Sequence, residues 1–151
     1  MAKLKPITDI LIELMPRKMA TIESSFKKTN HAPRKGDSLS LKLSMNLDIT
    51  LRNPGQDGAS KQVQVISKGN ADVFAAGPEK GGGNQLLAEC FVKIESLYDA
   101  CPGTKEEELK KHTEHFMCQS AIAIRDALRS LVASTDFHNM PLPFPRNSGE
   151  D

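Results

Sequence analysis

Residues 39–51 read LSLKLSMNLDITL, and this stretch decides the fold. Its odd positions are all Leu, Ile or Met, whereas the residues between them are polar. A period of two that persists over this length predicts a β-strand with one apolar face and one wet face. At about 3.3 Å per residue, such a strand would run to roughly 40 Å. The pattern therefore predicts an antiparallel sheet that is covered on one face only.

The remaining three strands are predicted over residues 18–28, 61–76 and 85–100. In the first segment, Ile22 and Phe26 are expected on one face. Gly69, in the middle of the second, indicates a bulge or a bend. In the third, the even positions form an apolar face, while Leu87 and Phe91 lie among charged residues on the other face. We expect that mixed face to point to solvent or to a partner.

A short amphipathic helix is predicted near the N-terminus, over residues 7–15. Its apolar residues follow helical spacing, and they are Ile7, Ile10, Leu11 and Leu14. Proline residues flank the segment at positions 6 and 16, where a helix commonly begins and ends.

Two helices are predicted after the strands, a short one over 105–112 and a longer one over 114–134. Thr104 and Glu107 fit a capping box, in which the threonine bonds to the third helical amide and the glutamate reaches back. The longer helix carries an apolar stripe at alternating steps of four and three residues. The stripe consists of Met117, Ala121, Ile124, Leu128 and Leu131.

This order of elements predicts an α+β fold in one domain that spans residues 1–151, a usual size for a single domain. The expected parts are an N-terminal helical extension (1–17), an antiparallel sheet (18–100), two helices (104–135) and a proline-rich tail (136–151).

The charge balance argues against a nucleic-acid partner, the cysteine count against a disulfide framework, and the length of the apolar segments against membrane insertion. The 151 residues carry 20 Lys and Arg against 19 Asp and Glu, a formal net charge of +1. Nucleic-acid binding would require a basic excess or a basic stripe, so we expect no nucleic-acid partner. Three cysteines are too few and odd in number for a disulfide framework. No segment approaches about 20 apolar residues, so we expect a cytoplasmic protein without membrane insertion.

Residues with catalytic or metal-binding chemistry are scarce. His112, His115 and Cys118 form an HxxHxxC run, but on a helix Cys118 is rotated by roughly 240° from His112. Cys90 falls on an apolar strand face, where a thiol packs rather than reacts. The glycine-rich stretch 77–84 lacks the GK[ST] ending of a phosphate-binding loop. We therefore expect no enzyme activity, no metal and no cofactor, and a metal protein built on the histidines is the least favoured hypothesis.

The strand faces hold more apolar positions than one short helix pair would cover. Such an excess indicates an oligomer interface or a binding groove. The alternative is that the helices simply cover the whole apolar face.

The chain resembles the bacterial export chaperone SecB over about residues 18–145. The resemblance rests on four long strands, a Pro-Gly turn, a short helix, a long helix and a tail rich in Pro, Leu and Phe. Its most specific stretch, read from Ile124, is IRDALRSLVASTDFHNMPLPFP. There Arg125, Asp126 and Phe137 match the family's arginine, its acidic neighbour and its helix-end aromatic residue.

The resemblance implies a four-stranded antiparallel sheet with two helices, assembled as a dimer or a dimer of dimers, without cofactor or catalysis. It implies a holdase for unfolded polypeptides that works in protein export with SecA, or one that serves a dedicated client such as an antitoxin. A SecB-fold adaptor that binds one folded partner is the alternative.

The resemblance also implies three groups of site residues. Client-binding residues would be Leu39, Leu41, Leu43, Tyr98 and Phe144. The surface for a SecA-like partner would include Glu23, Leu87 and Glu89. The apolar stripe of the long helix would form the oligomer interface. The neutral net charge departs from the family, because SecB proteins are strongly acidic.

Overall fold

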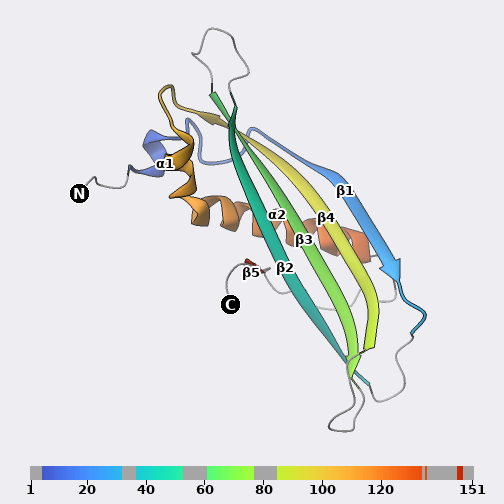
Figure 1. The fold of residues 1–151 in the computed structure, drawn as a ribbon. Helices are drawn as coiled ribbons and strands as arrows, with labels where there is room; N and C mark the ends of the chain where they lie inside the picture. The colour runs from blue at the N-terminus through green and yellow to red at the C-terminus, as the bar shows by residue number, and fades with distance from the viewer. Residues whose placement is uncertain are drawn as a thin grey trace.

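The computed structural model describes residues 5–31, 37–52, 61–76, 85–133, 135 and 146–147. The elements in chain order are η1 (Ile7–Asp9), β1 (Lys18–Lys28), β2 (Ser38–Arg52), β3 (Lys61–Ala76), β4 (Gln85–Ala100), α1 (Glu106–Lys110), α2 (Thr113–Val132) and β5 (Arg146–Asn147). The strands form one sheet in the order β1-β4-β3-β2-β5 (Figure 1). The four long strands pair antiparallel, and β5 lies parallel to β2. The structure thus confirms the predicted four-stranded antiparallel sheet with two following helices.

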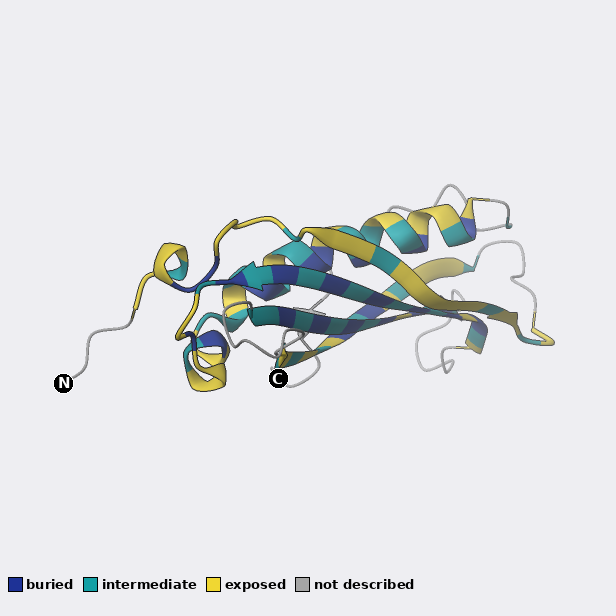
Figure 2. Cartoon of the chain, turned by 90° about the horizontal axis from the view of Figure 1, so that it is seen from above, coloured by how far each residue is buried: buried dark blue, intermediate teal, exposed yellow. Residues whose placement is uncertain are grey.

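Helix α2 lies along one face of the sheet (Figures 1 and 2), which we call the helix face. The opposite face, which we call the open face, has no described helix on it. Buried residues of β2, β3 and β4 on the helix face form a core with α2, and Ile124 and Leu128 are fully buried in it. Met117 and Leu131 pack against the same core. The stripe that we assigned to an oligomer interface is therefore the core-facing side of α2, because the apolar sheet of the same chain requires this cover.

A bulge in β4 reverses the expected direction of Leu87. Val73 pairs with Ala88, but its neighbour Phe74 pairs with Leu86, so Leu87 is the extra residue between them. A bulge of one residue shifts the alternation of side chains between the two faces. Leu87 is consequently fully buried in a small core cluster with Val73 and Ala88. The prediction that it belongs to a partner surface is corrected.

A second bulge lies in the edge strand β1. The register shifts between Thr21 and Glu23, which leaves Ile22 without a partner in the ladder. Ile22 is 49% exposed, whereas Phe26 packs against the core. The two residues therefore do not share an apolar face, because the bulge separates them.

Gly69 occupies a regular position in β3, so the predicted bulge there is wrong. It pairs with Met45 on one side and with Val92 on the other, without a register shift. Its position is on the helix face, directly beneath Ile124. A Cβ atom at residue 69 would collide with the Ile124 side chain, so close approach of the helix explains the glycine.

The N-terminal segment is a 3-10 turn followed by a single β-bridge residue and a series of bends, and the helix predicted over 7–15 is wrong beyond its first turn. Leu11 forms a β-bridge with the end of β4, and the Cys101 amide donates to the Ile10 carbonyl oxygen at 2.7 Å. Ile10 and Leu11 are buried, whereas Leu14 is 43% exposed. Pairing with β4 outweighs the helical spacing because so short a helix is marginal in water.

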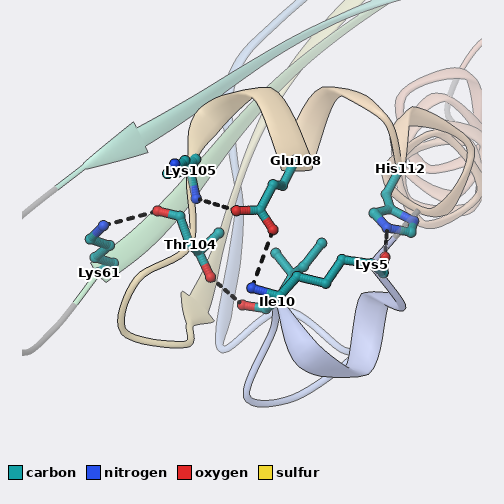
Figure 3. A network of polar contacts seen from close by, with 7 residues as sticks. All are labelled: Lys5, Ile10, Lys61, Thr104, Lys105, Glu108 and His112. Atoms are coloured by element: carbon teal, nitrogen blue, oxygen red, sulfur yellow. Dashed lines mark hydrogen bonds and ion pairs between the residues drawn. The ribbon is translucent and has the colours of Figure 1, made fainter. Parts of the chain in front are cut away.

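Polar contacts hold this segment against α1 and α2 (Figure 3). The Lys5 ammonium lies 3.5 Å from the Glu108 carboxylate. The Thr104 hydroxyl donates to the Ile10 carbonyl oxygen at 3.1 Å, and His112 Nε2 donates to the Lys5 carbonyl oxygen at 2.6 Å. The segment is therefore joined to β4 and to the start of α2 through its backbone, and to α1 through the Lys5 side chain.

The capping box of α1 is displaced by one residue from the prediction. The Lys105 amide donates to the Glu108 carboxylate at 3.3 Å, so Lys105 is the N-cap and Glu108 is the third helical residue. Thr104 does not cap the helix because its hydroxyl is bonded to Ile10.

In the described part of the chain, no helix is both long enough and apolar enough to cross a membrane.

Candidate functional site

The apolar row of β2 is covered in the middle and accessible toward its ends. Leu43 and Met45 are buried among α2 residues. Leu41, which precedes them, is half-buried, and Leu39 is 43% exposed. After Met45 the odd residues up to Leu51 are again half-buried. The side chains available to a ligand therefore lie in two stretches on either side of the covered middle.

One backbone edge of β2 pairs with no described strand over most of its length. One edge of β2 pairs with β3 from Ser38 to Arg52. The other edge pairs with β5 at Ser44 and Met45 and with no other described strand. Unpaired amide and carbonyl groups on such an edge form a template for another extended chain.

A cleft of about 740 Å³ opens where the second half of β2 faces α1 and the start of α2. Its walls combine Leu47 and Ile49 from β2 with Glu106 and Lys110 from α1 and Thr113 from α2. Apolar side chains thus stand beside an open backbone edge and a polar rim. An extended polypeptide could bury apolar side chains here and pair its backbone with the strand, which demands little of its sequence.

Tyr98 is a core residue of the monomer. Its side chain is fully buried, and its ring packs edge-to-face against Phe116 at a centroid distance of 5.1 Å. Burial raises the pKa of Tyr98 to about 12, and no hydrogen-bond partner reaches its hydroxyl among the described residues. Leu43 is likewise buried, so of the five predicted client-binding residues Leu39 and Leu41 are accessible. Phe144 lies outside the described residues.

The open face carries equal numbers of basic and acidic side chains. The basic ones are Lys18, Lys27, Lys42, Arg52, Lys68 and Lys93. The acidic ones are Glu23, Asp48, Asp72, Glu89, Glu95 and Asp99. Glu23 and Glu89, two of the residues predicted for a partner surface, are exposed on this face.

Two pairs of like charges stand directly opposite one another on the open face. Asp72 faces Glu89, and Lys68 faces Lys93, across the β3–β4 ladder. Burial, and next the Glu89 charge, raise the pKa of Asp72, while Lys42 opposes that rise. Like charges opposite one another destabilise a strand pair. Three of the four residues also face an opposite charge on their other side, since Asp72 faces Lys42, Glu89 faces Lys27 and Lys93 faces Glu23.

The histidines of the HxxHxxC run are engaged with the N-terminal segment. His112 Nε2 donates to the Lys5 carbonyl oxygen at 2.6 Å, and His115 Nε2 donates to the Leu14 carbonyl oxygen at 2.9 Å. Cys118 is exposed. Within the described ranges no three His, Cys, Asp or Glu side chains are grouped so that they could hold a metal ion.

Exposed apolar side chains gather at the β1 side of the molecule, a feature that the sequence analysis missed. They come from the N-terminal segment and from β1, and they are Ile12, Leu14, Met15, Met19 and Ile22. We call them the β1-side patch. The bond from His115 to the Leu14 carbonyl oxygen brings the N-terminal segment to α2 here. No periodicity could reveal the patch, because an irregular segment and a bulge expose its members.

No protein-family model matches the chain, and no curated protein matches it either. Among solved structures, the chain is similar to a SecB-like chaperone of Mycobacterium tuberculosis in complex with a ChAD peptide from the HigA1 antitoxin. The TM-score is 0.50 at 15% sequence identity, and the match covers 85% of this chain and 86% of that one. The likeness concerns the arrangement of strands and helices: this chain has a SecB-like fold.

Proposed function

We propose that the chain is a chaperone that binds extended, non-native stretches of polypeptide along β2. The observation that carries this proposal is the combination of an unpaired backbone edge with half-buried apolar residues and an adjoining cleft. Backbone pairing supplies affinity that does not depend on the sequence of the client. Every second side chain of the client would then contact the apolar residues of β2. Binding of this kind requires no catalytic group.

Suppression of aggregation tests the proposal. A denatured protein is diluted into buffer with the chain at about stoichiometric ratio, and light scattering is followed for several different proteins. Ile49→Asp places a carboxylate in the cleft and is expected to reduce protection at least about fivefold, because burying a charge is costly. The matched control is Asn70→Asp, which adds the same charge to the open face of β3, outside the cleft. Failure of the unchanged chain to protect any protein would overturn the proposal.

We further propose a dedicated client of the antitoxin-peptide kind rather than general export through SecA. The neighbouring structure holds an antitoxin peptide, which supports a peptide ligand for this fold. The open face carries equal numbers of basic and acidic side chains. It is therefore not the acidic surface that a basic docking surface of SecA would require. A pull-down from the source cell in which SecA is the main captured protein would contradict this choice.

Self-association through the β1-side patch is the third part of the proposal. The outer edge of β1 pairs with no described strand, and large apolar side chains stand along it. An exposed apolar edge strand favours pairing with a second copy about a two-fold axis. Light scattering should give a dimer or a dimer of dimers, and Ile22→Lys should shift the mass toward the monomer. The control Ser24→Lys adds the same charge to β1 outside the patch.

The second candidate is an adaptor that binds one folded partner through the open face. The charged side chains of the open face favour it, because a folded partner with complementary charges could pair with them. Lys68→Glu should then abolish capture of that partner and leave suppression of aggregation unchanged. The chaperone proposal predicts the reverse for Ile49→Asp, which should reduce suppression of aggregation.

A further inference from the structure

Strand β5 occupies the centre of the edge that the proposed function assigns to a client. It pairs in parallel with β2 at two positions, where Arg146 lies opposite Ser44 and Asn147 opposite Met45. The chain's own C-terminal region therefore shows that this edge accepts an added strand. At the same time β5 occupies positions on this edge that a client strand would need.

The position of β5 divides the free edge into two short stretches. Residues 38–43 lie on one side of the paired positions and residues 47–52 on the other, and neither stretch pairs with a further described strand. Each stretch spans only about 20 Å at the rise of a β-strand. An extended polypeptide that follows β2 for longer than about six or seven residues must displace β5.

The pairing is of a kind that can be displaced. Among the described residues it covers two positions, and parallel pairing is slightly weaker per residue than antiparallel pairing. Elements with so few backbone bonds open at low free energy without unfolding of the core. By contrast, β3 pairs with the other edge of β2 over all 15 residues of that strand, so the sheet persists when β5 leaves.

We propose that β5 is an internal competitor that must leave the edge of β2 before an extended polypeptide can add there as a strand. This inference rests on the proposed chaperone function and specifies how the same site is regulated. The apparent affinity for a client is then the intrinsic affinity reduced by the fraction of molecules whose edge is free. Release of β5 should strengthen binding of any extended client, whatever its sequence.

The test uses the full chain and a permanently unfolded probe, fluorescently labelled reduced and carboxymethylated α-lactalbumin. Asn147→Pro removes a backbone N–H from β5 and restricts its backbone, and a chain that ends at Pro145 lacks β5 altogether. Gly149→Pro is the matched control, since it adds the same residue two positions beyond β5. Both β5 variants are expected to lower the Kd for the probe about three- to tenfold, and the control is expected to leave it unchanged.

Amide hydrogen exchange on the free chain gives a second readout that does not depend on the probe. Faster exchange at residues 43–47 in Asn147→Pro, but not in Gly149→Pro, is expected if β5 protects this edge. Unchanged probe affinity in both β5 variants would overturn the competitor while leaving the chaperone proposal in place. Weaker binding would overturn it as well, because β5 would then be part of the binding surface. If no variant and no unchanged chain binds the probe, the chaperone proposal itself fails.

Discussion

Ile124 of α2 lies directly above Gly69 of β3, in the space that a Cβ atom at residue 69 would need. Gly69 is paired regularly on both sides, so the sheet is continuous beneath the helix. The missing side chain lets α2 approach the sheet at this point. Ile124 belongs to the same core cluster as Leu43 and Met45, so a side chain at residue 69 would disturb the cover that α2 provides over them.

Gly69→Ala should therefore destabilise the protein by about 1–3 kcal/mol, the usual cost of overpacking a core. The free energy of unfolding is measured by urea titration. The neighbouring Asn70→Ala is the control, since Asn70 is exposed on the open face and should change stability by less than about 0.5 kcal/mol. Equal effects of the two substitutions would contradict the packing of Ile124 on Gly69.

A double variant tests the same contact in the other direction. Ile124→Ala alone should cost about 2–5 kcal/mol because it leaves a cavity. In that background Gly69→Ala should cost less than in the unchanged chain, since the colliding side chain is gone. Strict additivity of the two changes would show that the residues do not touch.

The N-terminal segment gives a prediction that separates the observed irregular chain from the helix expected from the sequence. Leu11→Ala should lower the free energy of unfolding by about 2–5 kcal/mol because Leu11 is buried beside β4. Leu14→Ala should change it by less than about 0.5 kcal/mol, since Leu14 is largely outside the core. A helix over 7–15 would bury both residues and predicts similar losses, so thermal or urea unfolding of the two variants decides between them.

The three thiols should react in the order of their exposure. Cys118 is exposed and Cys101 is partly exposed, while Cys90 is buried and its pKa is raised to about 11, mainly by burial and next by the Asp72 charge. At pH 8 a thiol with that pKa is a thiolate in roughly one molecule in a thousand. Ellman's reagent should therefore modify Cys118 first and Cys90 only when the chain unfolds. Rapid modification of Cys90 in the native chain would contradict the buried position.

Tyr98→Phe probes a buried hydroxyl without a described hydrogen-bond partner. Near neutral pH the variant should be as stable as the unchanged chain or more stable by up to about 1 kcal/mol, because no bond is lost. The pKa of Tyr98 is raised from 10.0 to about 12. Its contribution to stability is thus fully present below pH 10 and is lost as the pH rises through 12.

Unfolding free energies at pH 9 and pH 11.5 measure that contribution. The loss between the two values should be smaller in Tyr98→Phe by about 1–2 kcal/mol, since phenylalanine does not titrate. Cys90 also titrates in this range but contributes equally to both proteins. Identical losses would mean that the Tyr98 hydroxyl is solvated in the folded chain. Client binding should be unchanged in Tyr98→Phe at neutral pH, because the ring lies in the core.

The strands were predictable because their alternation is long and regular. The expected limits of three strands, residues 18–28, 61–76 and 85–100, agree with those in the structure. The directions of Ile22 and Leu87 were not predictable, because a one-residue bulge leaves no trace in the hydrophobic pattern yet exchanges the two faces. The prediction of an N-terminal helix was wrong for a related reason. The segment pairs with β4, which is distant in the sequence, and local spacing of apolar residues contains no information on such a contact.

The candidate site was predicted in part. The apolar face of β2 follows from the sequence, but which of its residues stay accessible depends on where α2 lies. That position buries Leu43 and leaves Leu39 exposed, although the two occupy equivalent places in the alternation. The pairing of β5 with Ser44 and Met45 joins residues about 100 positions apart and has no signal in the pattern.

The central claim is that non-native polypeptide binds along the edge of β2. Amide hydrogen exchange of the chain, with and without saturating reduced and carboxymethylated α-lactalbumin, tests it most directly. The proposal predicts slower exchange at residues 47–52 of β2 on binding, with little change in β4, which is paired on both sides. Protection confined to β1, or none anywhere in β2, would contradict it.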